Sequence, residues 1–204
     1  MSHINKTSQT ITTSKVIEKL LPEYGSFEWT PRYDPASELV YTILSQHTSD
    51  LNSERAFKNL LSTFESLQNI ANADVEQIEN SIRMGGLAQT KAPRIKNILN
   101  QVLNEVGSFD LYFLKEMPLE EAKTWLKRLN GVGPKTAAII LCFSLGMPAM
   151  PVDTHIYRVA QRLRLIGQKV TADQAHDLLE AKVAPEDVFE FHLLLINHGR
   201  RVCK

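Results

Sequence analysis

Apolar residues recur every three or four positions along most of the chain, which is the spacing of amphipathic helices. No pair of segments shows the alternation of half-buried strands, so we predict an all-α fold of about ten helices. The segments with helical spacing are residues 14–21, 34–46, 51–64, 74–83, 91–107, 118–130, 134–146, 153–167, 171–183 and 185–199.

Two of these segments carry further signals. Asp34 precedes Pro35, the order typical of a helix cap followed by the first helical residue. The segment PKTAAIILCFSLG, residues 134–146, is apolar nearly all round, so we predict a buried central helix that Gly146 closes. Pro148 and Pro151 then interrupt the helical pattern, and we predict a boundary between two helical lobes there.

Composition narrows the class of protein. The chain has 204 residues, 43% of them hydrophobic, which is enough for a sizeable core. The polar start lacks the apolar stretch of a signal peptide, and no apolar run reaches the ~18 residues of a membrane span. Two cysteines exclude a disulfide framework. We therefore expect a soluble, cytoplasmic protein with no membrane partner.

Net charge is zero, with 23 basic and 23 acidic residues, but the charges are segregated. Residues 81–104 and 123–135 each carry four basic and no acidic residues, and residues 192–204 carry three basic and no acidic ones. A neutral chain with this distribution can present a basic face to nucleic acid.

The stretch LNGVGPKTAA, residues 129–138, places a lysine directly after a glycine-rich turn. It does not match an ATPase phosphate loop, because Pro134 rather than glycine precedes Lys135. The dinucleotide pattern fails as well, since Thr136 stands where the third glycine is needed. A plain turn with an exposed lysine and a helix-hairpin-helix that holds a nucleic-acid backbone both remain open.

The order of LNGVGPKTAA, an apolar helix, a proline turn and VDTHIYRV resembles the helix-hairpin-helix DNA glycosylases, in particular their endonuclease III branch. The resemblance extends from about Asp34 to Cys203. It implies two helical lobes with a DNA cleft between them. One lobe is a six-helix barrel that contains the hairpin, residues 31–147; the other joins residues 1–30 and 148–204.

The resemblance also implies roles for single residues. Lys135 would be the catalytic amine and Asp153 the catalytic carboxylate. Leu87 would enter the base stack and His47 would fill the vacated space, with Gln46 beside it. The backbone of the hairpin loop, Gly131, Val132 and Gly133, would bind a phosphate, because no Cβ of a glycine blocks a close approach. We expect the apolar helix behind Lys135 to bury its amine.

An amine nucleophile permits a Schiff base with the sugar and hence strand cleavage. We therefore predict a monomeric base excision repair enzyme that binds double-stranded DNA, removes damaged bases and cleaves the strand by β-elimination, with oxidised pyrimidines as its substrates. Thr42 stands where the adenine-excising branch has a glutamate, which argues against that activity. The alternatives are an 8-oxoguanine glycosylase/lyase and a non-catalytic DNA-binding protein. His47 stands where this branch more often has glutamine.

The family's iron–sulfur cluster uses four cysteines, and Cys203 matches the first of them. Cys142 lies within an apolar helix and is expected in the core. Two cysteines cannot supply the four thiolates of a [4Fe-4S] cluster. We thus expect no cofactor and no metal site in this chain, and a cluster with Cys203 as a ligand only if the native chain continues beyond Lys204. The histidines His155 and His192 are expected to be structural.

Overall fold

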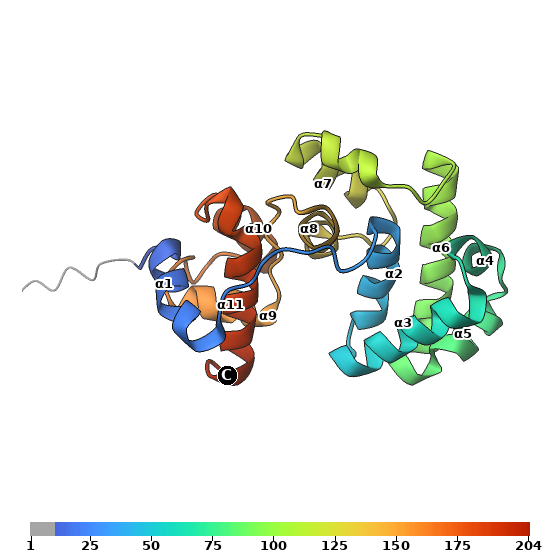
Figure 1. Cartoon of the computed structure of the whole chain (residues 1–204), viewed down its shortest axis with the longest axis horizontal. Helices are drawn as coiled ribbons and strands as arrows, with labels where there is room; N and C mark the ends of the chain where they lie inside the picture. The colour runs from blue at the N-terminus through green and yellow to red at the C-terminus, as the bar shows by residue number, and fades with distance from the viewer. Residues whose placement is uncertain (1–10) are drawn as a thin grey trace, which may run out of the picture. The chain divides into compact units, whose positions relative to one another are not determined.

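A computed structural model describes residues 11–204 (Figure 1). Within these residues the chain forms α-helices joined by short 3-10 and π segments, with no β-strand, which confirms the all-α prediction. None of the helices found in residues 11–204 is long and apolar enough to cross a membrane. Contacts divide the chain into two compact units, which we name by their place in the sequence: the central unit, 30–149, and the terminal unit, which joins 150–204 to the described part of 1–29.

The predicted domain bounds, 31–147 against the remainder, stay a prediction beside this contact-based division. The helices of the central unit are α2 (Pro35–Ser45), α3 (Asp50–Phe64), α4 (Leu67–Asn72), α5 (Val75–Ile82), η1 (Arg83–Gly85), α6 (Ala88–Val106), η2 (Tyr112–Glu116), α7 (Leu119–Lys127), α8 (Pro134–Ile139) and the π segment η3 (Ile140–Ser144). The long helix α6 packs against α2, α4 and α5 (Figure 1).

Helix α2 begins where the sequence indicates. The Oδ1 atom of Asp34 accepts hydrogen bonds from the backbone N–H groups of Ala36 at 3.1 Å and Ser37 at 3.0 Å, and Pro35 occupies the first helical turn. The carboxylate thus satisfies two N–H groups that have no partner inside the helix.

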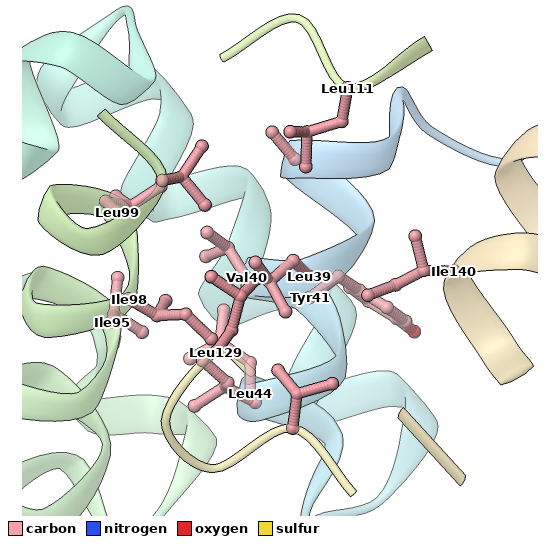
Figure 2. Close-up of a cluster of buried hydrophobic side chains, with 14 of the residues drawn as sticks. Leu39, Val40, Tyr41, Leu44, Ile95, Ile98, Leu99, Leu111, Leu129 and Ile140 are labelled. Carbon is pink, nitrogen blue, oxygen red and sulfur yellow. The ribbon is translucent and has the colours of Figure 1, made fainter. Parts of the chain in front are cut away.

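The core of the central unit joins α2 to α6 and to the hairpin loop (Figure 2). Ile95, Ile98 and Leu99, spaced three and four residues apart on α6, are at most 2% exposed. They pack in the same cluster as Leu39 and Leu44 of α2. Figure 2 also shows Leu129, at the base of the hairpin loop, and Ile140 of η3 in this cluster. The core therefore holds the loop that precedes Lys135 against α2, the helix that ends directly before Gln46.

The apolar helix predicted for residues 134–146 is buried as expected, but its form differs. Helix α8 ends at Ile139, and a π-helix continues from Ile140 to Ser144. The backbone N–H of Met147 then donates to the carbonyl of Leu141 at 2.9 Å. Gly146 has φ +65°, yet it follows the π segment rather than a regular α-helix. An all-apolar pattern does not distinguish α from π hydrogen bonding, because it has no polar face from which the number of residues per turn can be read.

The terminal unit contains α1 (Thr13–Tyr24), α9 (Thr154–Arg162), α10 (Ala172–Glu180), η4 (Pro185–Asp187) and α11 (Val188–Arg201). Helix α11 packs against α1 and α9. Gly199 allows the close approach of α9, since a Cβ there would lie 2.9 Å from the Cβ of His155. His192 is buried and its Nδ1 lies 2.9 Å from the carbonyl oxygen of Pro151, a structural contact at the start of this unit.

Candidate active site

The hairpin loop between α7 and α8 is held from both sides. Leu129 and Val132 turn inward, at 1% and 7% exposure. On the outer side, the amide of Gln101 on α6 makes two bonds to the loop backbone: its Oε1 accepts from the N–H of Asn130 at 2.9 Å, and its Nε2 donates to the carbonyl of Arg128 at 3.2 Å. Two apolar anchors and one bidentate amide thus fix the backbone of the loop.

The two glycines of the loop differ in backbone conformation and in the space around them. Gly131 has φ +85°, a conformation that side chains rarely adopt, and a Cβ there would lie 3.1 Å from a guanidinium nitrogen of Arg94. Gly133 has φ −93°, and a Cβ there would meet nothing within 4 Å. Because neither backbone conformation nor internal packing requires glycine at 133, its open side leaves room for an external group to approach the backbone closely.

Three backbone amides of the loop were candidates for binding a phosphate. The N–H of Val132 donates to the carbonyl of Leu129 at 3.0 Å, so it is already used inside the turn. For the N–H groups of Gly131 and Gly133 no acceptor is found within residues 11–204. Val132 therefore contributes its buried side chain to the loop, and the two glycine amides are the ones open to an anion.

Lys135 lies in the first turn of α8, directly after Gly133 and Pro134. Its side chain is exposed, so the expectation that the apolar helix buries this amine is wrong. The three residues that follow it, Thr136, Ala137 and Ala138, are buried instead. Because the side chain leaves the helix start on the opposite face, the amine is presented to solvent and is accessible to a substrate.

Asp153 is the N-cap of α9 in the terminal unit. Its Oδ1 accepts from the N–H of Ile156 at 2.7 Å, and its backbone carbonyl accepts from the N–H of Tyr157 at 2.8 Å. The side chain is half-buried. In the part of the chain that the structure describes, Oδ2 has no hydrogen-bond partner. Oδ1 thus caps the helix, while Oδ2 can still accept a hydrogen bond or a proton from another group.

Four non-glycine residues of the described chain have left-handed backbone: His47, Glu65, Leu87 and Arg164. Glu65 is the C-cap of α3, where this conformation is common, whereas two of the others are exposed residues in loops of the central unit. His47, just after α2, has φ +52°, and Leu87, just before α6, has φ +53°. Left-handed backbone costs a non-glycine residue about 1–2 kcal/mol. His47 is exposed, and Leu87 is 55% exposed although it is apolar. Strain of this kind occurs mainly at functional sites, where the surrounding structure enforces it.

Gln46 is held between these loops and the hairpin. Its Oε1 accepts a bond of 2.8 Å from the guanidinium of Arg94, the same group that lies beside Gly131. The three segments expected to contact DNA, 46–47, Leu87 and 131–133, therefore belong to one unit, and Arg94 links two of them.

The runs of basic residues contribute less to a basic face than their number suggests. Lys91 is 2% exposed and donates to protein acceptors, and Lys96 donates to the carbonyl of Ala73 at 2.7 Å. Lys123 is 8% exposed and forms an ion pair of 2.7 Å with Glu120. The ammonium groups of these three lysines are bonded to protein acceptors, whereas Lys127 and Lys135 are exposed.

A buried carboxylate, paired with a partly exposed arginine, lies one turn before Thr42, and sequence reasoning missed it. Glu38 is 0% exposed and accepts two hydrogen bonds from the guanidinium of Arg32, one from Nε at 2.9 Å. Thr42 donates to the same carboxylate at 3.4 Å. Burial raises the pKa of Glu38, and the charge of Arg32 opposes this rise. A glutamate inside the apolar run ELVYTIL was the signal that could have revealed the pair.

The residues of this chain do not fit an iron–sulfur cluster. Cys142 is 1% exposed in the core of the central unit, and Cys203 lies in the terminal unit with its Sγ 3.1 Å from Arg162. Within residues 11–204 no group of three or more histidine, cysteine or acidic side chains could hold a metal ion. A [4Fe-4S] cluster needs four thiolates, twice the number present.

Comparison with known proteins shows the family of this chain. The model of the HhH-GPD superfamily of base excision DNA repair proteins matches residues 40–185. A protein of Arabidopsis thaliana that carries the name "Putative DNA glycosylase" is 41% identical over 162 residues, which span 79% of this chain but only 55% of that relative. Endonuclease III of Sulfolobus acidocaldarius is 33% identical over 168 residues, 81% of this chain and 73% of the relative.

The endonuclease III of Thermotoga maritima is 34% identical over 174 residues, covering 84% of this chain and 76% of the relative. Among solved structures, a trapped endonuclease III–DNA covalent intermediate superposes with a TM-score of 0.79 at 23% identity, over 95% of this chain and 89% of that one. At this identity the superposition shows a shared fold. The chain therefore belongs to the HhH-GPD superfamily of base excision DNA repair proteins, in its endonuclease III branch.

Proposed function

We propose that this chain is a DNA glycosylase and AP lyase that acts on double-stranded DNA with a damaged base or an abasic site, and that its damaged bases are oxidised pyrimidines. The exposed amine of Lys135, placed directly after the glycine loop in a chain of this family, is the observation that carries the proposal. Pure phosphate binding by the loop does not require an amine at that position.

In the proposed reaction the neutral amine of Lys135 attacks C1′ of the sugar, and the bond from C1′ to the base breaks as the new C–N bond forms. The base leaves with the bonding electron pair and takes up a proton from solvent water. Asp153 takes a proton from the attacking nitrogen and stabilises positive charge that develops on the sugar. The sugar ring then opens: the C1′–O4′ bond breaks, O4′ takes the proton held by Asp153, and the nitrogen lone pair forms the C=N bond of a Schiff base with Lys135. Loss of a proton from C2′ eliminates the 3′ phosphate and cleaves the strand, and water releases the enzyme.

Residues of the central unit support the binding part of the proposal. The open N–H groups of Gly131 and Gly133 would donate hydrogen bonds to a phosphate without regard to base sequence. A base within the stack is out of reach, so its nucleotide must be flipped out at a cost of a few kcal/mol. Leu87 and His47, both exposed and both held in left-handed backbone, are the side chains that we propose to enter the duplex, with Gln46 beside them.

Borohydride trapping tests the proposal directly, because it reduces a Schiff base to a stable covalent bond. Wild-type protein should be trapped on a duplex with an oxidised pyrimidine, and Lys135→Gln should lose trapping and strand cleavage while it still binds duplex DNA. Lys127→Gln is the matched control, since it removes one exposed lysine of α7 close to the hairpin. Undiminished trapping of Lys135→Gln would show that another amine is the nucleophile. Cleavage of 8-oxoguanine duplexes in preference to oxidised pyrimidines would overturn the proposed substrate.

A further inference from the structure

Lys91, the fourth residue of α6, carries a buried ammonium group whose hydrogen bonds all go to neutral acceptors. At 2% exposure its Nζ donates to the carbonyl of Leu44 at 2.7 Å, to Oγ1 of Thr48 at 2.5 Å and to the carbonyl of Gly85 at 3.1 Å. An ammonium has three N–H donors, so these three acceptors use its full capacity. Burial lowers the pKa of Lys91, and the nearby charge of Arg94 lowers it further.

A buried ammonium without a carboxylate partner lowers stability, since an apolar side chain of similar size would avoid the desolvation penalty. The positions of its three acceptors indicate its role. Leu44 supplies one of the last carbonyls of α2, which has no partner within its own helix and lies at the end that favours a cation. Thr48 lies in the loop after α2, and Gly85 ends η1. Lys91 therefore ties three separate segments to α6.

These segments flank the two strained residues. The hydroxyl of Thr48 lies 2.6 Å from the carbonyl of Gly85 and 3.2 Å from that of Gln46, so the loop 46–48 and the loop 85–87 are also bonded to each other directly. His47 lies between Gln46 and Thr48, and Leu87 follows Gly85 by two residues. Both residues have φ above +50°. Left-handed backbone persists only where neighbouring contacts enforce it, and the bonds of Lys91 and Thr48 are those contacts.

We propose that Lys91 is a positioning residue, whose buried ammonium joins the loops 46–48 and 85–87 so that His47 and Leu87 meet the DNA as one preset pair. This inference rests on the proposed function, because it gives the two side chains their role at the duplex. It assigns no DNA contact to Lys91 itself, whose side chain is enclosed by the protein. Preset side chains avoid the loss of conformational freedom that flexible loops would suffer on binding.

The experiment compares Lys91→Met with Lys96→Met. Lys96 is on the same helix and donates a single bond to the carbonyl of Ala73, away from both loops. Hydrogen exchange should accelerate at least tenfold for amides of 46–48 and 85–87 in Lys91→Met, with α3 unchanged. Single-turnover cleavage of an abasic site in duplex DNA should slow at least tenfold, while cleavage of the same site in a single strand changes less than about threefold. Lys96→Met should match wild type in all three measurements.

If Lys91→Met does not fold, Thr48→Val carries the same test, because it removes the hydroxyl between the loops and leaves Lys91 its bonds to Leu44 and Gly85. Equal loss of cleavage on single-stranded and duplex substrates, or unchanged exchange in both loops, would overturn the inference. Failure of the proposed function is distinguishable from this, since wild-type protein would then cleave neither substrate, whereas the exchange measurement would still report whether Lys91 couples the loops.

Discussion

Replacing Leu87 by alanine should slow cleavage of duplex DNA without unfolding the protein. Leu87 is 55% exposed, so just over half of its side chain is still available for burial in a base stack. Full burial of a leucine is worth about 1.5–3 kcal/mol. The available share is about 0.8–1.7 kcal/mol, which corresponds to about a 4- to 16-fold loss of duplex cleavage at subsaturating enzyme. Stability should fall by about 1 kcal/mol or less, since the side chain is largely outside the core.

Leu87→Gly separates the side chain from the backbone. Both variants remove the same apolar group, so duplex cleavage should fall to a similar extent. The left-handed backbone is strained for alanine but not for glycine, so Leu87→Gly should be the more stable of the two by about 1 kcal/mol. Thermal denaturation measures this difference.

The assay is single-turnover cleavage of one abasic-site oligonucleotide, measured as a duplex and as a single strand. The loss should be confined to the duplex, because a single strand has no stack to enter. A sharp fall of the melting temperature in Leu87→Ala, together with equal losses on both substrates, would mean that Leu87 is a packing residue and that its exposure has no role in flipping.

Three further predictions concern buried or capping charges. Asp153→Asn should keep its melting temperature and its affinity for duplex DNA, because asparagine caps a helix as well as aspartate does. The rate of base release should fall about 100-fold or more. A fully active variant would mean that capping α9 is the only role of Asp153. Arg32→Met should destabilise the protein by about 1–3 kcal/mol in denaturant titrations at pH 7, because it leaves the buried carboxylate of Glu38 without its charged hydrogen-bond donor. Since the pKa of Glu38 is raised on folding, this deficit should shrink towards pH 5 as the carboxylate takes up a proton; an equal deficit at both pH values would contradict the argument. The pKa of Lys91 is lowered on folding, so the unfolded chain binds the proton more tightly than the folded protein. The free energy of unfolding of wild type should therefore rise relative to that of Lys91→Met from pH 7 towards pH 10. A difference that stays constant with pH would contradict this argument.

Local signals in the sequence were sufficient for most of the helices and for the family; α4, at 67–72, was not predicted, and the segment 134–146 was predicted as one α-helix. The 3.6-residue spacing of Ile95, Ile98 and Leu99 predicts the buried face of α6, and Asp34 with Pro35 predicts the start of α2, because caps and amphipathic faces depend on neighbours within one or two turns. The stretch from Leu129 to Lys135 and the later Asp153 indicate the endonuclease III branch for the same reason: the spacing of a motif is a property of the chain itself.

Only the tertiary structure decided which charges face solvent and which backbones are strained. Lys91 and Lys135 look alike in sequence, since both are lysines at the start of helical segments. One is enclosed by acceptors from three other segments, and the other points away from its helix into solvent. The left-handed backbones of His47 and Leu87 also depend on bonds between loops that are 37 residues apart, from Thr48 to Gly85. Such contacts exist only after α2 and α6 have packed together, so no local pattern encodes them.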